Sequence, residues 1–319
     1  MNAIERVCVS LLLVGVLALS AVASEPLRVS LDFFPNPNHV PLALAATSGL
    51  FSRGGIDVDL VVPANPSDPV KLAAVGSVDV AITPQINYLI ARSEGLPLVA
   101  VGALVDRPLG GLLTLATTPI VGVEDLAGRR IGYSLAPLEP ALWRTMLACA
   151  GVEAADVRLV NVGFNTMVSL LTGAVDAIGA FRNYEPIQLE LLGHAGRFFA
   201  QEEHCIPYTY DLLFVARPEL LSDRPEAVRA FLAAVAEAVD LTRGDPTAAF
   251  AAFLRVWPDL DDELSRRTFE ATLPLYAEGL RHDDPLVWGE IQSYLLSVDL
   301  VSSEVPVDEL YTAELLPGK

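Results

Sequence analysis

The chain has 319 residues, of which 52% are hydrophobic and 19% are charged, and its formal net charge is −19. This composition is typical of a globular protein with a large core and excludes a disordered chain. No cluster of Lys or Arg stands out among 40 acidic and 21 basic residues, so nucleic acid and anionic membrane surfaces are disfavoured as partners, because phosphate binding needs concentrated positive charge.

The first 23 residues have the pattern of an export signal. Arg6 stands in a short start, an apolar run follows, and the small-x-small sequence AVA ends the run. We predict cleavage after Ala23 or Ser24 and a periplasmic mature protein. The alternative is a membrane anchor, but the run is slightly shorter than the roughly 20 residues that a span needs. Cys8 lies near the start of the run, so a lipid anchor at the cleavage point is not supported.

Residues 24–105 alternate between strand and helix patterns, and we expect them to form the first part of one lobe. Apolar or alternating runs typical of strands are "LRVSLDFF", "IDVDLVVP", "VDVAITP" and "LPLVAVGALV". Helical patterns separate them in "PLALAATSGLF", "DPVKLAAVGS" and "INYLIARSEG". This alternation predicts a mainly parallel sheet covered by helices.

The same order restarts in residues 106–211, which we expect to form a second lobe. "VEDLAGRRIGYS" leads into a strand, "EPALWRTMLACAG" predicts a helix, and "VRLVNVG" predicts the next strand. "TMVSLLTGAVDAIGAF" predicts a helix and a strand, and "NYEPIQLELLG" begins another helix. The phrases "VKLAAVGSVDVAI" and "VSLLTGAVDAIGA" share a helix, a glycine, x-Val-Asp and a strand. Coincidence is the alternative, but we interpret the likeness as two similar α/β lobes.

Residues 212–319 lose the strand patterns after about Leu213. The helical stretches there are "PEAVRAFLAAVAEAVDLTRG", "PTAAFAAFLRVW", "DDELSRRTFEATLPLYAEG" and "DPLVWGEIQSYLLSVDLV". We expect the chain to return to the first lobe and to finish there as a helical tail.

Polar and aromatic side chains follow the predicted strands of both halves, where ligands of open α/β sheets bind. In the first half they are Asp32, Phe33, Phe34, Asn36, Asn38 and His39, and then Thr83, Pro84, Gln85 and Asn87. In the second half they are Ser134, Asn165, Thr166, Phe181, Asn183, Tyr184 and Glu185.

This set of amides, hydroxyls and aromatic rings suits a flat, uncharged heterocycle, whose faces stack on rings and whose edge is read by amides. Glu185 would accept from an exocyclic amine or a ring N–H. The predicted ligand-binding residues are Phe34 for stacking, Asn36, Thr83 and Gln85 for the polar edge, Tyr184 with Glu185 from the other lobe, and also His39 and Asp211.

Most of these residues have a structural alternative. Asn36 and Asn38 can cap the following helix and satisfy turn amides. His39 can be a buried histidine with satisfied hydrogen bonds, and Tyr184 can be ordinary packing. Glu185 begins a helix, where the helix dipole favours a carboxylate.

Cysteine and histidine spacing predicts no metal site. Cys149 and Cys205 remain after cleavage of the leader, and two distant cysteines permit a disulfide without requiring it. We expect two buried small side chains. CxxC and HExxH spacings do not occur, and neither do the G-x-S-x-G, G-x-G-x-x-G and Walker A patterns.

Five stretches resemble the family that includes periplasmic pyrimidine-precursor-binding proteins and the eukaryotic thiamine-pyrimidine synthases. They are "LDFFPNPNHVPL", "GLFSRGGIDVDLV", "NPSDPVKLAAVGSVDVAI", "EGLPLVAVGALV" and "RNYEPIQLELLG". The resemblance extends from about Leu27 to about Leu221. It implies a type II periplasmic-binding-protein fold, with two α/β lobes, a hinge and a ligand in the cleft. The binding members of the family deliver a pyrimidine to an ABC transporter, whereas the synthases use pyridoxal phosphate and iron to make it.

Three departures from the synthase pattern favour the binding members. Where the synthases have a lysine and a histidine, the resemblance places Thr83 and Asn87, and Thr83 has no amine for a Schiff base. Their cysteine-rich run is reduced to Cys205 in "HCIPYTYDLLFVAR". Their phosphate-gripping loop is replaced by "SLAPLE", which lacks both the Gly and the Lys that would hold a phosphate.

The sequence therefore predicts an exported solute-binding protein that is not an enzyme and needs no cofactor. We expect it to bind a small heterocycle, best matched by a thiamine-precursor aminopyrimidine, and to present it to the permease of an ABC importer. Lobe closure would then create the surface that the transporter recognises. The alternatives are a pyrimidine synthase, a binding protein for riboflavin or for a sulfonate, and a sensor or orphan binder. We expect a monomer.

Overall fold

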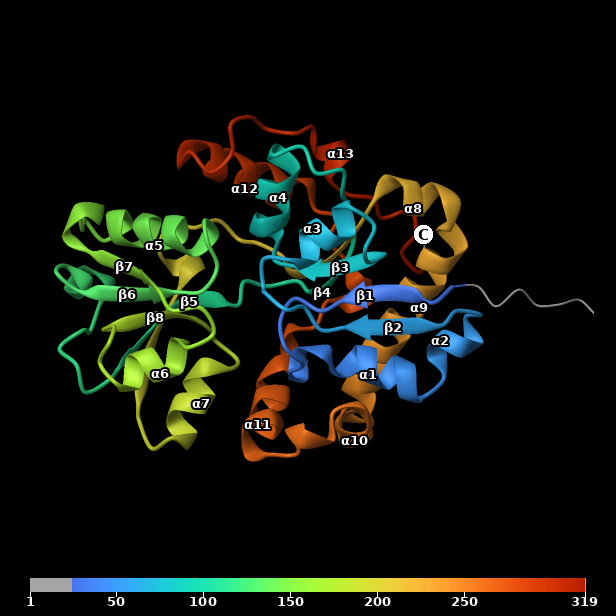
Figure 1. Ribbon diagram of the computed structural model, residues 1–319, viewed down its shortest axis with the longest axis horizontal. Helices are drawn as coiled ribbons and strands as arrows, with labels where there is room; N and C mark the ends of the chain where they lie inside the picture. The colour runs from blue at the N-terminus through green and yellow to red at the C-terminus, as the bar shows by residue number, and fades with distance from the viewer. Residues whose placement is uncertain (1–24, 319) are drawn as a thin grey trace, which may run out of the picture.

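Two lobes lie side by side in the computed structural model, which describes residues 25–318 (Figure 1). The predicted export signal, residues 1–23, lies outside the described part of the chain. Each lobe is built on one five-stranded sheet. We call the lobe that contains the first strand lobe I and the other lobe II. Across residues 25–318, no helix is long and apolar enough to cross a membrane.

Lobe I has the strand order β2-β1-β3-β10-β4. Strand β1 pairs in parallel with β2 and β3, whereas β10 is antiparallel to both of its neighbours. The strands are β1 Leu27–Ser30, β2 Val58–Val61, β3 Val80–Thr83, β4 Val99–Val105 and β10 Asp211–Ala216. The helices between the first four strands are α1 Val40–Thr47, α2 Leu50–Arg53, α3 Pro69–Ala74 and α4 Gln85–Ser93.

Lobe II repeats this arrangement with the order β7-β6-β8-β5-β9, in which β5 is the antiparallel strand. The strands are β5 Gly110–Leu115, β6 Arg130–Tyr133, β7 Arg158–Asn161, β8 Ala177–Phe181 and β9 Gly196–Ala200. The helices are α5 Leu138–Cys149, α6 Thr166–Leu171 and α7 Glu185–Leu191. The predicted α/β class with two similar lobes is confirmed, and each sheet is mixed because one antiparallel strand is inserted into it.

Strands β5 and β9 were not predicted, because glycines open both of them and weaken the strand signal. The sheet itself needs one of these glycines. A Cβ atom added to Gly111 would lie 2.3 Å from the carbonyl oxygen of Phe199 on the neighbouring strand. The close pairing of β5 with β9 therefore excludes any side chain at position 111, including the β-branched and aromatic ones that are typical of strands.

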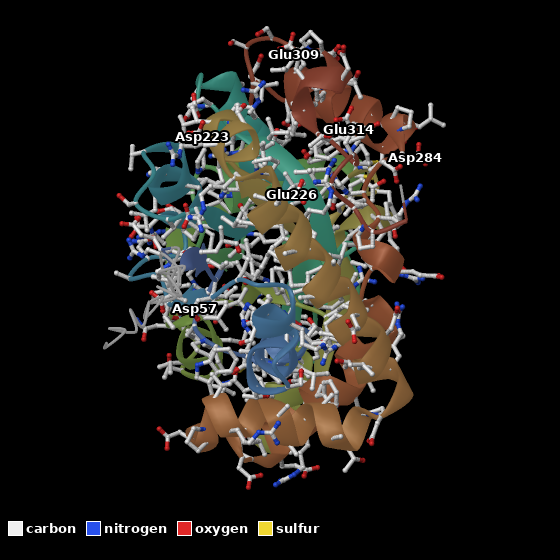
Figure 2. All side chains as sticks on the ribbon, turned by 90° about the vertical axis from the view of Figure 1, so that its right-hand side faces the viewer. Asp57, Asp223, Glu226, Asp284, Glu309 and Glu314 are labelled. Atoms are coloured by element: carbon white, nitrogen blue, oxygen red, sulfur yellow. A yellow bond between two sulfur atoms is a disulfide. The ribbon has the colours of Figure 1, made fainter. Side chains whose placement is uncertain are left out.

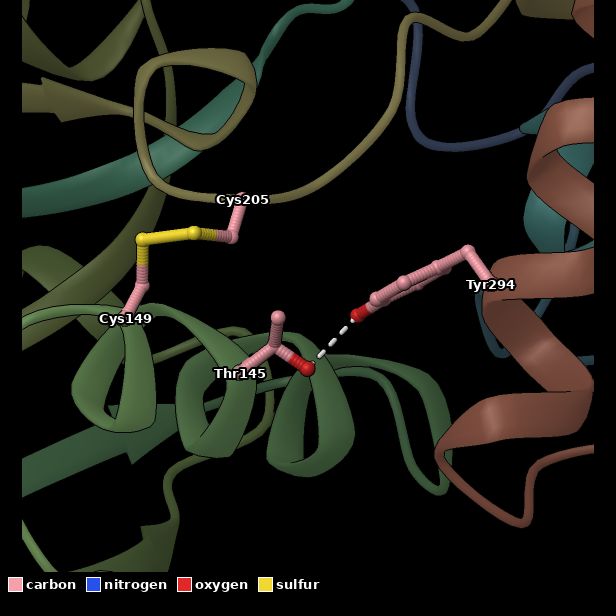
Figure 3. Close-up of a disulfide and its surroundings, with 4 residues drawn as sticks. All are labelled: Thr145, Cys149, Cys205 and Tyr294. Carbon is pink, nitrogen blue, oxygen red and sulfur yellow. Dashed lines mark hydrogen bonds between the residues drawn. A yellow bond between two sulfur atoms is a disulfide. The ribbon is translucent and has the colours of Figure 1, made fainter.

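The tail of the chain is helical, as predicted. It comprises α8 Pro218–Asp223, α9 Pro225–Gly244, α10 Pro246–Val256, α11 Glu263–Thr272, α12 Pro285–Ser297 and α13 Val307–Leu310. Helices α9 and α10 pack against α1 in lobe I. Two tail helices also reach lobe II: Arg267 of α11 pairs with Glu190 of α7, and the Tyr294 hydroxyl of α12 lies 2.8 Å from Thr145 Oγ1 of α5 (Figure 3).

A disulfide joins Cys149, the last residue of α5, to Cys205 in the segment that leads back to lobe I (Figure 3). The two Cα atoms are 5.9 Å apart, and both residues are exposed. The expectation of two buried small side chains was therefore wrong. The return of the chain brings Cys205 to the end of α5, a contact that a sequence separation of 56 conceals.

Candidate ligand-binding site

A pocket lies between the lobes beside the carboxyl ends of β1, β3, β6 and β8, where an open α/β sheet binds its ligands. It encloses about 1160 Å³ when the space at its mouth is included. Lobe I and the segments that join the lobes contribute Asp32, Phe33, Phe34, Asn36, Asn38, Pro66, Pro84, Ile86, Gln201, Thr209 and Asp211. Lobe II contributes Gly110, Ser134, Leu135, Leu138, Glu139, Leu142, Trp143, Phe164, Thr166, Gly179, Ala180, Phe181, Tyr184 and Glu185.

The turn after β1 is shaped by its own polar side chains. Asn36 Oδ1 accepts from the Asn38 N–H at 2.9 Å, and Asn36 Nδ2 donates to the carbonyl of Phe34 at 3.1 Å. Asn36 also caps a short 3₁₀ helix, Pro37–His39. Asn36 therefore lines the pocket, but its side-chain amide is hydrogen-bonded within the turn. This is the capping role that the sequence analysis gave as the structural alternative.

Three phenylalanine rings from the two lobes meet at the pocket. Phe33 lies 4.1 Å from Phe34 and 4.9 Å from Phe164, measured between ring centroids. Phe34 and Phe164 keep 40% and 47% of their surface exposed, which leaves ring area for stacking on a flat ligand. The structure thus places Phe34 where stacking was predicted. Phe164 was not predicted, because the residues selected after this strand were its polar neighbours, Asn165 and Thr166.

Tyr184 and Glu185 bring polar groups to the pocket from lobe II, at the start of α7. Glu185 Oε2 accepts from the Phe181 N–H at 2.7 Å. Burial raises the pKa of Glu185 to about 7, and the negative charge of Glu139 adds to that shift. Burial likewise raises the pKa of the Tyr184 phenol to about 12, so the hydroxyl is a neutral donor near pH 7.

Glu139 is a second lobe II carboxylate on the pocket, and the sequence reasoning did not select it. Glu139 Oε2 accepts from the Ser134 N–H at 2.6 Å, and Oε1 accepts from the Ser134 hydroxyl at 3.2 Å. Burial raises the pKa of Glu139 against the effect of these hydrogen bonds. The signal was present in "SLAPLE", whose last residue is this acid.

Asp32 and Asp211 place two further carboxylates on the pocket, near the junction of the lobes. Asp211 Oδ2 accepts from the Leu109 N–H at 2.7 Å. Burial, together with a smaller effect of the Asp32 charge, raises the pKa of Asp211 to about 7. The structure thus places Asp211 on the pocket, as the sequence predicted.

His39, Thr83 and Gln85 were predicted to touch the ligand, but the structure places them behind the pocket wall. His39 Nε2 lies 2.8 Å from Asp32 Oδ1 and donates to it, because His39 Nδ1 accepts from the backbone N–H of Asn36. All three side chains are buried. A strand-end position predicts nearness to the site, but it does not predict which side chains turn inward.

The polar groups of Thr83 and Gln85 have partners within the protein. Thr83 Oγ1 accepts from Asn87 Nδ2 at 3.0 Å, and Gln85 Oε1 accepts from the Tyr210 N–H at 2.9 Å. Gln85 therefore anchors the segment that returns from lobe II instead of reading a ligand.

The pocket has an acidic character, since four carboxylates and no Lys, Arg or His lie among the described residues that line it. A buried carboxylate is costly unless a donor or a positive charge compensates for it. The lining therefore favours a ligand rich in N–H donors. Sulfonate and phosphate groups would add negative charge and find no cation in the wall.

Pyridoxal phosphate, which the synthases of the resembling family use, does not fit these residues. A Schiff base needs an amine, and Lys71 is the single lysine among residues 25–318. Lys71 is exposed on α3 and is absent from the pocket lining. Within residues 25–318, no group of three or more His, Cys, Asp or Glu side chains is placed to hold a metal ion.

The sequence profile described as "NMT1/THI5 like" matches residues 36–249, which is more than half of the chain. A protein of Haemophilus influenzae named for thiamine biosynthesis is 34% identical over 94% of this chain and 95% of its own length. The chain belongs to the NMT1/THI5-like family. The predicted family resemblance is thereby confirmed.

Relatives of this NMT1/THI5-like chain include both binders and enzymes. The formylaminopyrimidine-binding protein of Halalkalibacterium halodurans is 28% identical, and the match covers 91% of each chain. The 4-amino-5-hydroxymethyl-2-methylpyrimidine phosphate synthase of Legionella pneumophila is 25% identical over 94% of this chain and 95% of its own length.

Solved structures confirm the predicted fold of this NMT1/THI5-like chain. The periplasmic aliphatic sulphonate binding protein of Escherichia coli superposes with a TM-score of 0.69 over 92% of this chain and 94% of its own. The two sequences are 19% identical, so the likeness concerns the fold alone. The fold is that of the periplasmic binding proteins, with the pocket between two lobes.

Proposed function

We propose that this protein is an exported solute-binding protein that captures an amine-bearing heterocycle between its lobes and delivers it to the permease of an ABC importer. A thiamine-precursor aminopyrimidine is the ligand that the site suits best. The observation that carries the proposal is the pocket lining, which combines aromatic rings from both lobes with four carboxylates and no cation among its described residues.

The chemistry of the lining supports this ligand class over the alternatives. An aminopyrimidine offers flat faces to Phe33, Phe34 and Phe164 and N–H donors to the carboxylates. A sulfonate would need cationic donors that the lining lacks. A flavin is flat, but its carbonyl oxygens are acceptors and face an acidic wall. The names of the relatives that bind or make thiamine pyrimidines support the same class.

Binding without catalysis is supported by the residues that occupy the synthase positions. Thr83 and Asn87 bond to each other beside the pocket, and neither can form a Schiff base. Solute capture needs only a pocket that closes around its ligand, and lobe closure gives the permease a surface that differs from that of the open protein.

The test is a thermal-shift screen of the purified protein, followed by calorimetry, because a ligand that binds only the folded state raises the melting temperature. The probes are 4-amino-5-hydroxymethyl-2-methylpyrimidine, its phosphate ester, riboflavin and ethanesulfonate. We expect stabilisation by the free aminopyrimidine and little by the two anions. Stabilisation by ethanesulfonate, or by none of the pyrimidines, would overturn the proposal.

A further inference from the structure

Helix α5 carries two pocket residues one turn apart, Glu139 and Trp143, and their polar atoms are complementary. Residues four apart on a helix lie on the same face. Both side chains line the pocket against Gly179 of β8. A Cβ atom added to Gly179 would lie 3.0 Å from Glu139 Oε2 and 2.8 Å from Trp143 Cζ2. Gly179 thus lets the carboxylate and the nitrogen-bearing edge of the indole approach the same spot.

Glu139 keeps hydrogen-bonding capacity for a ligand. Its Oε2 atom accepts from two backbone N–H groups, those of Ser134 at 2.6 Å and Leu135 at 3.4 Å. Its Oε1 atom accepts only from the Ser134 hydroxyl, at 3.2 Å. A carboxylate oxygen can accept two hydrogen bonds, so Oε1 can still take an N–H donor. The backbone contacts fix the carboxylate in position for that purpose.

Trp143 holds a donor that the protein does not use. The side chain is 2% exposed, and its Nε1–H has no hydrogen-bond partner among residues 25–318. A buried N–H without an acceptor is costly and uncommon in folded proteins. Trp288 is different, since it is equally buried but donates to the carbonyl of His282 at 2.7 Å. Trp143 lines the pocket, so its Nε1–H is a donor available to a ligand there.

We propose that Glu139 and Trp143 form a paired acceptor and donor that reads a ligand edge on which an N–H donor stands next to a ring acceptor. The 4-amino group and the adjacent ring nitrogen of a 4-aminopyrimidine have this pattern. A 4-oxo ring has the reverse pattern, because its carbonyl accepts and its ring N–H donates. The inference rests on the proposed function and narrows it to heterocycles with an amidine-like edge.

Glu139 would also oppose the binding of a phosphorylated ring. Glu139 ends the stretch "SLAPLE", which lacks both the Gly and the Lys of a phosphate-holding loop. The position that would need positive charge carries a buried carboxylate instead. A phosphate placed there would meet like charge. The ligand that fits is the free heterocycle.

Calorimetry with two probes tests the inference: 4-amino-5-hydroxymethyl-2-methylpyrimidine and its 4-oxo counterpart. The wild-type protein should prefer the amino probe, because a site built around hydrogen bonds strongly rejects the reversed pattern. Trp143→Phe removes the indole N–H together with part of the ring, and Glu139→Gln replaces an acceptor with an amide that can donate. Each change should reduce the preference for the amino probe by about tenfold, the effect of losing one buried hydrogen bond.

The preference ratio separates ligand reading from a purely structural role, because general destabilisation affects both probes alike. Trp288→Phe is the matched control, which deletes a buried indole N–H outside the pocket and should leave the ratio unchanged. Glu139→Gln decides the matter if Trp143→Phe does not fold. An unchanged ratio in the folded pocket variants would overturn the roles proposed for Glu139 and Trp143 but leave the proposed function intact. A wild-type protein that binds neither probe would overturn the proposed function as well.

Discussion

Asn183 of lobe II donates a hydrogen bond to Asn38 of lobe I, with 2.7 Å between Nδ2 and Oδ1. The same Nδ2 atom lies 2.8 Å from Thr272 Oγ1 in the tail. All three side chains are buried, so the cluster joins the two lobes away from water. From the sequence, both asparagines were expected near the ligand because they follow predicted strands. In the structure they join the two lobes beside the pocket.

Asn183→Ala should weaken ligand binding, because it removes the donor that joins the lobes and leaves Asn38 Oδ1 with one partner fewer. We expect a loss of about 1–3 kcal/mol in binding free energy, the cost of breaking a buried hydrogen bond. Calorimetry gives the affinity, and small-angle scattering gives the compactness of the ligand-free protein. Asn161→Ala is the control, since Asn161 is exposed and its side chain accepts from the Gly163 N–H within lobe II. Equal affinities for the two variants would contradict this role.

Glu185→Gln should weaken an amine-bearing ligand by about 1–3 kcal/mol, because a charge-assisted acceptor becomes a neutral amide. Calorimetry with 4-amino-5-hydroxymethyl-2-methylpyrimidine measures the change. Glu226→Gln is the matched control: Glu226 also lies in the first turn of a helix, but on the face of lobe I in Figure 2, with its side chain 85% exposed. Unchanged affinity in Glu185→Gln would remove this residue from the site.

The ligand-free protein should lose stability as the pH rises from about 5 to 8. Burial raises the pKa of Glu185 from 4.5 and of Asp211 from 3.8, in both cases to about 7. The folded state therefore binds more protons than the unfolded state in this window, and the free energy of unfolding falls with pH. The pKa of Asp176, which Arg130 holds down, changes stability only at lower pH. Urea denaturation at pH 5, 6, 7 and 8 measures the slope, which Glu185→Gln should make shallower.

Reduction of the disulfide should destabilise the protein by about 2–4 kcal/mol, as expected for a cross-link that closes a loop of this length. Denaturation with and without a phosphine reductant measures the difference. The double variant Cys149→Ser with Cys205→Ser should be as unstable as the reduced protein and insensitive to the reductant. A reductant effect that persists in the double variant would show that the loss has another cause.

Pyridoxal phosphate should form no Schiff base in the pocket, because the lining contains no lysine. Absorption spectra of the protein mixed with pyridoxal phosphate and ferrous iron should lack a new imine band. Lys71→Arg combined with Lys319→Arg distinguishes surface modification from chemistry in the pocket, since these are the two lysines of the sequence and Lys71 is exposed on α3. An imine band that survives these substitutions would favour the synthase alternative.

The fold was predictable because its main signal is local. Alternating apolar runs and amphipathic helices recur in both halves, and they gave two α/β lobes and a helical tail. The positions of the antiparallel strands β5 and β10 within the two sheets carry no such local mark, although β10 itself is an apolar run. Their pairing depends on where the chain crosses between the lobes, and Gly110 and Gly111 give β5 little strand propensity. The disulfide was missed because Cys149 and Cys205 meet only when the lobe II elements between them, β7 to β9, are in place.

The candidate site was predictable only where it follows strand ends. Phe34 and Glu185 line the pocket because parallel strands end at the same edge of a sheet, and Asp211 reaches that edge as the first residue of the antiparallel strand β10. His39 and Gln85 lie behind the wall, where their partners, Asp32 and Tyr210, hold them. Glu139 lies on a helix rather than directly after a strand, so the strand-end rule did not select it.

The strand orders also determine which half of the molecule can fold first. All strands of lobe II come from one continuous stretch, β5 to β9, whereas strand β10, which lies between β3 and β4 in lobe I, comes after that stretch. A chain that emerges from its N-terminus therefore presents every strand of the second sheet before the first sheet can be filled. During synthesis or translocation, the sheet of lobe I therefore stays incomplete between β3 and β4 until the whole of lobe II has emerged and β10 follows it.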